Sequence, residues 1–166
     1  MNIDFSKESM DEIARLIAQY PSGRKKSALL PVLHVVQKEK GWLSADTMEQ
    51  VALLLEIKPI EVFEVATFYS MYFTKPVGKY VIEICQTGPC MICGAEDIIA
   101  YLERKLSIKV GETTSDGMFT LKTVECLGAC GYAPMFQIGE TFYENLTSDK
   151  IDEIISQLSS KANTGI

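Results

Sequence analysis

The segments Cys85-Gln-Thr-Gly-Pro-Cys90-Met-Ile-Cys93-Gly94 and Glu125-Cys126-Leu-Gly-Ala-Cys130-Gly131 hold all five cysteines of the 166-residue chain. Cysteines that act as small hydrophobic residues would be scattered through the core positions of the sequence. Here they are grouped in two short segments that also contain glycine. Because thiolates bind zinc and iron-sulfur clusters well, this grouping indicates a metal site.

The spacing of the cysteines favours a 2Fe-2S cluster over zinc. Four residues separate Cys85 from Cys90, three separate Cys126 from Cys130, and thirty-five separate Cys90 from Cys126. Structural zinc sites usually take each half from a tighter Cys-x2-Cys turn, because all the thiolates bind one small ion. A 2Fe-2S cluster spreads its four thiolates over two irons and accepts wider loops. The glycines would let backbone N–H groups turn towards the sulfurs and offset their negative charge.

Five cysteines for four ligand positions leave an ambiguity. Cys85, Cys90 and Cys93 followed by a distant cysteine also fit the plant-type ferredoxin spacing, in which Cys93 is a ligand and Cys126 or Cys130 is spare. Against that set, an amphipathic helix is expected directly after Cys93, and the last two cysteines form a matched pair in one glycine-rich turn. We therefore predict Cys85, Cys90, Cys126 and Cys130 as ligands, and Cys93 as a part-buried free thiol at a helix start.

The composition indicates an ordinary folded protein. Hydrophobic residues make up 47% of the chain and charged residues 23%, and the net charge of -6 argues against a nucleic-acid surface. No apolar run approaches the roughly 18 residues needed to cross a bilayer, and the N-terminus lacks a secretory signal. The odd number of cysteines without an export signal argues against a disulfide framework. We expect a cytoplasmic protein that binds no nucleic acid and is not inserted in the membrane.

The first 75 residues show helical periodicity and no catalytic or metal-binding motif. Ser9 to Glu12 can form a capping box, and Pro31 requires the second helix either to bend or to begin near Leu30. His34, the only histidine, is expected to pack buried or half-buried. The aromatic segment 68–73 either packs in the core between the two halves of the chain or faces a partner. The helices are expected at residues 6–20, 24–40 and 45–55, and from Pro59 to about Tyr69.

Pro76-Val77-Gly78 marks a boundary, which gives predicted domains at residues 1–75 and 76–166. After it, two β patterns each end at a cysteine segment, so two neighbouring strands would bring both thiol pairs to one edge of a small sheet carrying two helices. The expected elements are a strand at 80–84, a helix at 94–106, a strand at 119–124, a hairpin at 134–143, and a helix at 149–158 with a frayed tail at 159–166.

Together these residues resemble the thioredoxin-like 2Fe-2S subunit family of respiratory complex I, the NADH:quinone oxidoreductase. The similarity covers nearly the whole chain and implies an α+β or α/β architecture: an N-terminal helical bundle followed by a thioredoxin-like ferredoxin domain. It also implies ligands at Cys85, Cys90, Cys126 and Cys130, without Cys93. Besides the cysteine spacing, the resemblance lies in the runs Leu30-Pro-Val-Leu-His34, Ala66-Thr-Phe-Tyr-Ser70, Asp116-Gly-Met-Phe-Thr-Leu121 and Val124-Glu-Cys-Leu-Gly-Ala-Cys130.

The resemblance implies an electron-transfer subunit of an oxidoreductase, with no catalytic residues of its own. Its 2Fe-2S cluster would exchange single electrons with FMN in a partner subunit that also carries the NADH site and a 4Fe-4S cluster. The sequence contains neither a Gly-x-Gly-x-x-Gly motif after a strand nor a phosphate-binding P-loop, in keeping with that division. The chain would be peripheral to the membrane through its complex.

Three alternatives remain at this point. Equivalent subunits occur in NAD-linked hydrogenases and formate dehydrogenases, and the cysteine motifs do not separate these from complex I. A zinc-stabilised interaction module would bind zinc and lack a reducible chromophore. A thiol-disulfide oxidoreductase would use Cys90-x-x-Cys93 at a helix start, which leaves the other three cysteines unexplained.

Overall fold

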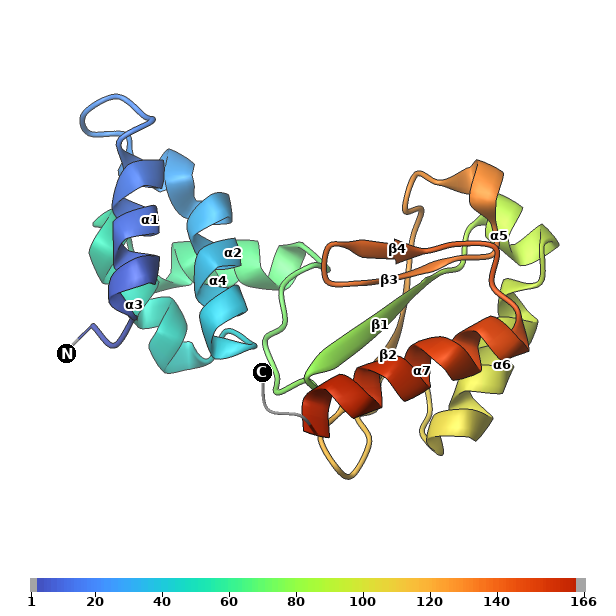
Figure 1. Ribbon diagram of the computed structural model, residues 1–166. Helices are drawn as coiled ribbons and strands as arrows, with labels where there is room; N and C mark the ends of the chain where they lie inside the picture. The colour runs from blue at the N-terminus through green and yellow to red at the C-terminus, as the bar shows by residue number, and fades with distance from the viewer. Residues whose placement is uncertain (1–2, 164–166) are drawn as a thin grey trace. The chain divides into compact units, whose positions relative to one another are not determined.

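The computed structural model describes residues 3–163 and divides the chain into two compact units, with the division between Pro76 and Val77. Figure 1 shows helices alone in the first unit and a sheet with helices in the second. We call them the helical unit and the cysteine unit and describe each by itself. Among residues 3–163, no helix is long and apolar enough to cross a membrane.

The helical unit contains the four predicted helices, and their ends follow local sequence rules with one exception. Ser44 caps the third helix by accepting a hydrogen bond from the Thr47 N–H at 3.1 Å. Pro31 lies in the first turn of the second helix, where its missing N–H leaves no gap in the hydrogen bonding, so this helix begins at Leu29. The helices are α1 (Lys7–Ile17), α2 (Leu29–Lys40, preceded by a 3-10 turn at Lys25–Ala28), α3 (Ala45–Leu55) and α4 (Pro59–Phe68).

The exception is the start of α1, where the predicted capping box from Ser9 to Glu12 is wrong. Ser6 is the cap, and its side chain accepts a hydrogen bond from the Ser9 N–H at 3.1 Å. The reason is a contact made across the unit: the Ser6 N–H and hydroxyl both donate to the Glu39 carboxylate near the end of α2. Glu12 pairs instead with Arg15, one turn further on.

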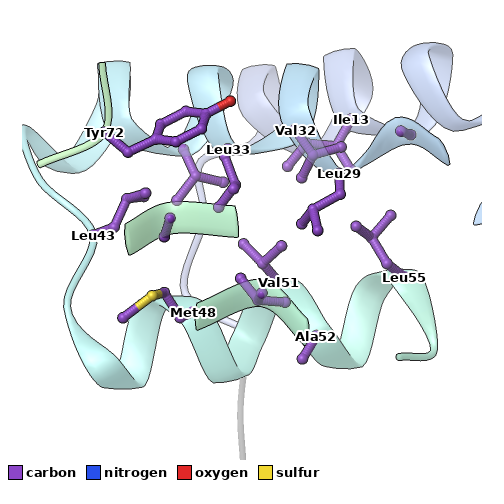
Figure 2. Packing of buried hydrophobic residues seen from close by; sticks show 14 residues of the cluster. Ile13, Leu29, Val32, Leu33, Leu43, Met48, Val51, Ala52, Leu55 and Tyr72 are labelled. Atoms are coloured by element: carbon purple, nitrogen blue, oxygen red, sulfur yellow. The ribbon is translucent and has the colours of Figure 1, made fainter. Parts of the chain in front are cut away.

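One apolar cluster from all four helices fills the helical unit, and Figure 2 shows its side chains meeting between the helices. Tyr72 belongs to it, and its hydroxyl donates to the Leu30 carbonyl at 2.9 Å. Phe68, in the same aromatic segment, is by contrast 80% exposed. The prediction that His34 is buried or half-buried is wrong: it is exposed, with its ring centroid 5.1 Å from that of Tyr72. Its face of α2 lies outside the cluster that holds Val32, Leu33 and Val36.

The cysteine unit is built on a four-stranded sheet with the order β2-β1-β3-β4. The first two strands run parallel, and the other neighbours are antiparallel, with β3 and β4 forming the predicted hairpin. Helices α6 and α7 pack on the sheet face that carries Ile82 and Ile84, in one cluster with Phe136. The elements are β1 (Tyr80–Cys85), α5 (Gly88–Ile92), α6 (Ala95–Leu106), β2 (Phe119–Val124), β3 (Phe136–Ile138), β4 (Thr141–Tyr143) and α7 (Ser148–Asn163).

Two features of this unit differ from the sequence prediction. The short helix α5 was not predicted, because five residues carry no readable period. Helix α7 continues to Asn163, so the predicted frayed tail is wrong for residues 159–163; residues 164–166 lie outside the described part of the chain. The Thr147 cap is as predicted, since its hydroxyl accepts a hydrogen bond from the Lys150 N–H at 3.3 Å.

Candidate metal centre

The two cysteine segments leave the sheet side by side. In the parallel register of β1 and β2, Cys85 is paired with Val124, and each cysteine segment follows directly. The Gln86 N–H donates to the Val124 carbonyl at 3.0 Å, which extends the pairing one residue past β1. Because parallel strands end at the same edge of a sheet, the two segments start at one end of the unit.

Cys85 and Cys90 form the buried half of the site, and they are 2% and 1% exposed. Cys85 is the last residue of β1, and Cys90 lies on α5, whose first turn is closed by the Met91 N–H donating to the Thr87 carbonyl at 3.0 Å. The short helix therefore turns the chain back so that the second thiol lies near the strand end.

Cys126 and Cys130 form the exposed half. Gly128 lies between them with a φ of 79°, a left-handed conformation that favours glycine, and its N–H donates to the Cys126 sulfur at 3.3 Å. Cys130 opens a 3-10 turn that ends at Tyr132. The predicted inward N–H group is thus confirmed at Gly128.

The pKa values of the thiols show that the two pairs interact electrostatically. Burial acts to raise the pKa of Cys85, but hydrogen bonds from the Thr87 hydroxyl and from backbone N–H groups lower it overall. Burial and the neighbouring Cys85 raise the pKa of Cys90 to about 11, with a smaller effect of Cys130. The hydrogen bond and charge of Cys126 raise the pKa of Cys130, and Cys85 adds to this.

The raised pKa values of Cys90 and Cys130 mean that these two thiols hold negative charge poorly on their own, and a cation beside them would stabilise it. Thiolates are the form that binds metal, and a metal ion removes the protons from such a group. All five cysteines are free of disulfides. Among residues 3–163, no group of three or more His, Cys, Asp or Glu side chains is placed to hold one metal ion. The arrangement is two pairs of thiols, which fits the donor set of a two-iron cluster.

An apolar layer of side chains packs against the two buried thiols, Cys85 and Cys90. Cys85 and Cys90 are buried together with Ala95, the first residue of α6, and with Met135, which is 1% exposed. The partly buried side chains that pack against them come from both segments: Met91, Leu127, Ala129 and Ala133. Figure 1 shows α5 beside the 3-10 turn that follows β2, at one end of the sheet. This layer holds the loops in place and limits the access of water to the buried sulfurs.

Sequence reasoning missed two residues that bond the buried thiols. The Thr87 hydroxyl lies 3.3 Å from the Cys85 sulfur, and a backbone group of Met135 forms a hydrogen bond that lowers the pKa of Cys90. A threonine two residues after a ligand is a readable signal. Met135 is not, because it follows the second segment in sequence and reaches the first one only through β3.

Cys93 lies apart from these contacts. It is exposed, so the prediction of a part-buried thiol is wrong. The predicted helix start directly after it is confirmed, because Gly94, with a φ of 94°, is the N-cap of α6. Cys93 is also the C-cap of the unpredicted α5, which ends at Ile92.

Comparison with known proteins gives relatives that match most of the chain. The E subunit of the NADH-quinone oxidoreductase of Rickettsia felis is 45% identical over 159 residues, which is 95% of each chain. An E subunit of the NADH-quinone oxidoreductase of Rhizobium meliloti is 43% identical over 145 residues, or 87% of this chain and 85% of the relative.

Among solved structures, the NAD+-reducing [NiFe]-hydrogenase in its H2-reduced state matches with a TM-score of 0.68 and 21% identity. The match covers 77% of this chain and 22% of the hydrogenase chain, and it shows a shared fold. A family model described as thioredoxin-like [2Fe-2S] ferredoxin matches residues 13–159. The chain therefore belongs to the thioredoxin-like [2Fe-2S] ferredoxin family.

Proposed function

We propose that this chain is the electron-transfer subunit of an NADH-quinone oxidoreductase and holds one 2Fe-2S cluster through Cys85, Cys90, Cys126 and Cys130. The observation that carries the proposal is the parallel pairing of β1 with β2, which starts both cysteine segments at one end of the sheet. Membership in the ferredoxin family and 45% identity to a subunit of an NADH-quinone oxidoreductase support it.

When bound, the cluster would accept and release one electron at a time. The chain's own groups set the conditions for this. The N–H of Gly128 and the hydroxyl of Thr87 point at sulfurs and reduce the cost of negative charge there. The apolar layer under Cys85 and Cys90 keeps water away from the buried pair, whereas the second pair is open to a partner.

The division of labour in the complex belongs to the same proposal. Residues 1–75 would form the helical domain and residues 76–166 the ferredoxin domain. A partner subunit would carry FMN, the NADH site and a 4Fe-4S cluster, and would exchange single electrons with this chain. The hydrogenase resemblance is to the fold, at 21% identity, whereas the relatives from NADH-quinone oxidoreductases reach 45% identity, which favours the second host.

The test is to purify the full chain anaerobically, record its visible spectrum, measure iron and acid-labile sulfide, and reduce it with dithionite. We expect about two irons and two sulfides per chain and a paramagnetic signal in the reduced state. Zinc without sulfide would overturn the proposal.

Two cysteine variants test the ligand set. Cys126→Ala should lose or severely destabilise the coloured centre, whereas Cys93→Ala should keep it. The reverse result would favour the plant-type ligand set, which contains Cys93.

A further inference from the structure

Thr87 lies at the position where a side chain ordinarily caps a helix. It is the N-cap residue of α5, yet within the described part of the chain its hydroxyl caps no N–H of that helix. A threonine at this position normally accepts a hydrogen bond from the N–H of the second or third helical residue. The second residue of α5 is Pro89, which has no N–H. Capping therefore does not explain the threonine at this position.

Other hydroxyl residues that directly precede a helix behave differently. Ser44 caps α3 and Thr147 caps α7, and each accepts a hydrogen bond from an N–H three residues further along the chain. The Thr87 hydroxyl instead lies 3.3 Å from the sulfur of Cys85, two residues back. The structure thus turns this side chain away from its helix and towards a proposed ligand of the cluster.

The direction of the hydrogen bond follows from the charge of the sulfur. In the free thiol either partner could donate, but a thiolate bound to iron has no hydrogen, so the Thr87 hydroxyl must then be the donor. Hydrogen bonds to charged acceptors are stronger than those to neutral ones. Adding one electron makes the sulfurs of the centre more negative, and this hydrogen bond therefore contributes more after reduction than before it.

We propose that Thr87 is a positioning residue that acts through Cys85: by donating to the Cys85 sulfur, its hydroxyl stabilises the one-electron-reduced centre more than the oxidised one and raises the reduction potential. The inference rests on the proposed function, because Cys85 must be a ligand of the cluster. The electron comes from the reduced flavin of the partner subunit or, in the test, from dithionite. No bond forms or breaks at Thr87, whose hydroxyl keeps its hydrogen.

The contribution of this side chain can be separated from that of the backbone. The Gly128 N–H, which donates to the Cys126 sulfur at 3.3 Å, belongs to the main chain. Backbone N–H groups of Thr87 and Leu127 also favour the thiolate form of Cys85, and substitution of a side chain does not remove them. Valine has nearly the shape of threonine and lacks the hydroxyl. Because other donors stay in place, we expect a shifted potential and a centre that is still bound.

The experiment is a redox titration of the purified, iron-loaded full chain with dithionite, followed by visible absorption and by the paramagnetic signal of the reduced state. At a fixed ambient potential, Thr87→Val should lower the ratio of reduced to oxidised centres about tenfold, which for a one-electron couple is a midpoint about 59 mV lower. Thr87→Ala should shift the ratio in the same direction. Thr87→Ser, which keeps a hydroxyl, should stay within about twofold of the wild type. The shift should be equal on both sides of neutral pH, because the hydroxyl does not titrate there.

The matched control is Thr147→Val, the same substitution at a threonine that does cap its helix. It should lower the midpoint of denaturant unfolding, because a cap is lost. The ratio of reduced to oxidised centres should stay within about twofold of the wild type. A merely structural effect of losing a threonine hydroxyl is thereby distinguished from an effect on the potential.

The outcomes separate this inference from the proposed function. A wild-type chain that lacks iron and sulfide overturns the function itself. Iron-loaded Thr87→Val and Thr87→Ala variants with the wild-type ratio overturn the inference and leave the function standing. A tenfold shift in Thr87→Ser also overturns it, even where the hydroxyl-free variants hold no iron, because the methyl group would then be responsible. A shift that changes with pH does the same, since it would come from a titrating group.

Discussion

The helical unit and the cysteine unit are of similar size but differ in cysteine content, charge and the number of apolar clusters. The helical unit has no cysteine and a nearly balanced charge, with nine lysines and arginines against ten aspartates and glutamates up to Pro76. The cysteine unit holds all five cysteines and has seven basic against twelve acidic residues. The first has one apolar cluster, and the second has a main cluster and a separate small one under the thiols.

This difference shows how the candidate site is built. The large cluster of the cysteine unit fixes the sheet against α6 and α7, and the strand ends project the cysteine segments beyond it. The thiols can then lie where buried and exposed surroundings meet. The helical unit has no thiols to place at the boundary between core and solvent, so its core can be packed for stability alone.

The strongest test of this comparison uses one large core truncation in each unit. Leu33→Ala, at a fully buried α2 residue, should destabilise the helical unit by about 2–5 kcal/mol, and Phe136→Ala, fully buried in β3, should destabilise the cysteine unit by about 3–5 kcal/mol. Trp42, the only tryptophan, reports on the helical unit by fluorescence, and the visible absorption of the bound cluster reports on the other.

We expect each truncation to move mainly its own signal in a denaturant titration. If both signals move together in both variants, the two units unfold as one and the comparison fails.

A smaller effect is expected at Gly78, where the cysteine unit begins. A Cβ on this residue would lie 2.9 Å from the backbone carbon of Phe119, and its N–H donates to the Thr120 hydroxyl at 2.6 Å. Because backbone atoms cannot give way cheaply, Gly78→Ala should cost about 1–3 kcal/mol, measured by denaturant-induced loss of the cluster absorption. Gly131→Ala, where an added Cβ meets nothing within 4 Å, should leave the midpoint unchanged.

Tyr72 should make the helical unit sensitive to alkali. Burial raises the pKa of Tyr72 to about 12, above the value near 10 of an unfolded tyrosine. Its contribution to stability is therefore complete below pH 10 and is lost as the pH rises towards 12. Tyr72→Phe should remove this loss from Trp42-monitored unfolding and cost about 0.5–1.5 kcal/mol at neutral pH, because the hydrogen bond to Leu30 is gone. An unchanged alkaline profile in the variant would contradict this origin.

The smallest effect is expected at Glu39, on the acid side. Hydrogen bonds from the side chain of Ser9 and from Ser6 lower the pKa of Glu39 to about 2. The stabilisation is present above the unfolded value near 4.5 and is lost as the pH falls through about 2. Since solvent screens this carboxylate, Glu39→Gln should cost only about 0.5 kcal/mol at pH 6 and nothing at pH 2, by urea unfolding monitored at Trp42. Glu8→Gln serves as the control, with no change at either pH.

The sequence by itself determined the elements whose signals are local. Ser44 caps α3 because its hydroxyl reaches an N–H three residues away, and the strands that lead to Cys85 and Cys126 follow from their alternating patterns. The grouping of the cysteines, and with it the family, was equally local, since ligand spacing is set by neighbouring residues.

Only the tertiary structure decided the features that depend on distant residues. Ser6 rather than Ser9 caps α1, because Glu39 lies beside Ser6 and accepts its hydrogen bonds. Strand β1 pairs with β2 in a register that places Cys85 opposite Val124. The exposure of His34 and the buried place of Tyr72 depend on which face of each helix meets the core. Capping hydrogen bonds and periodicity depend on residues a few positions apart, so the sequence reveals them. The contacts between distant residues form only after the chain has packed.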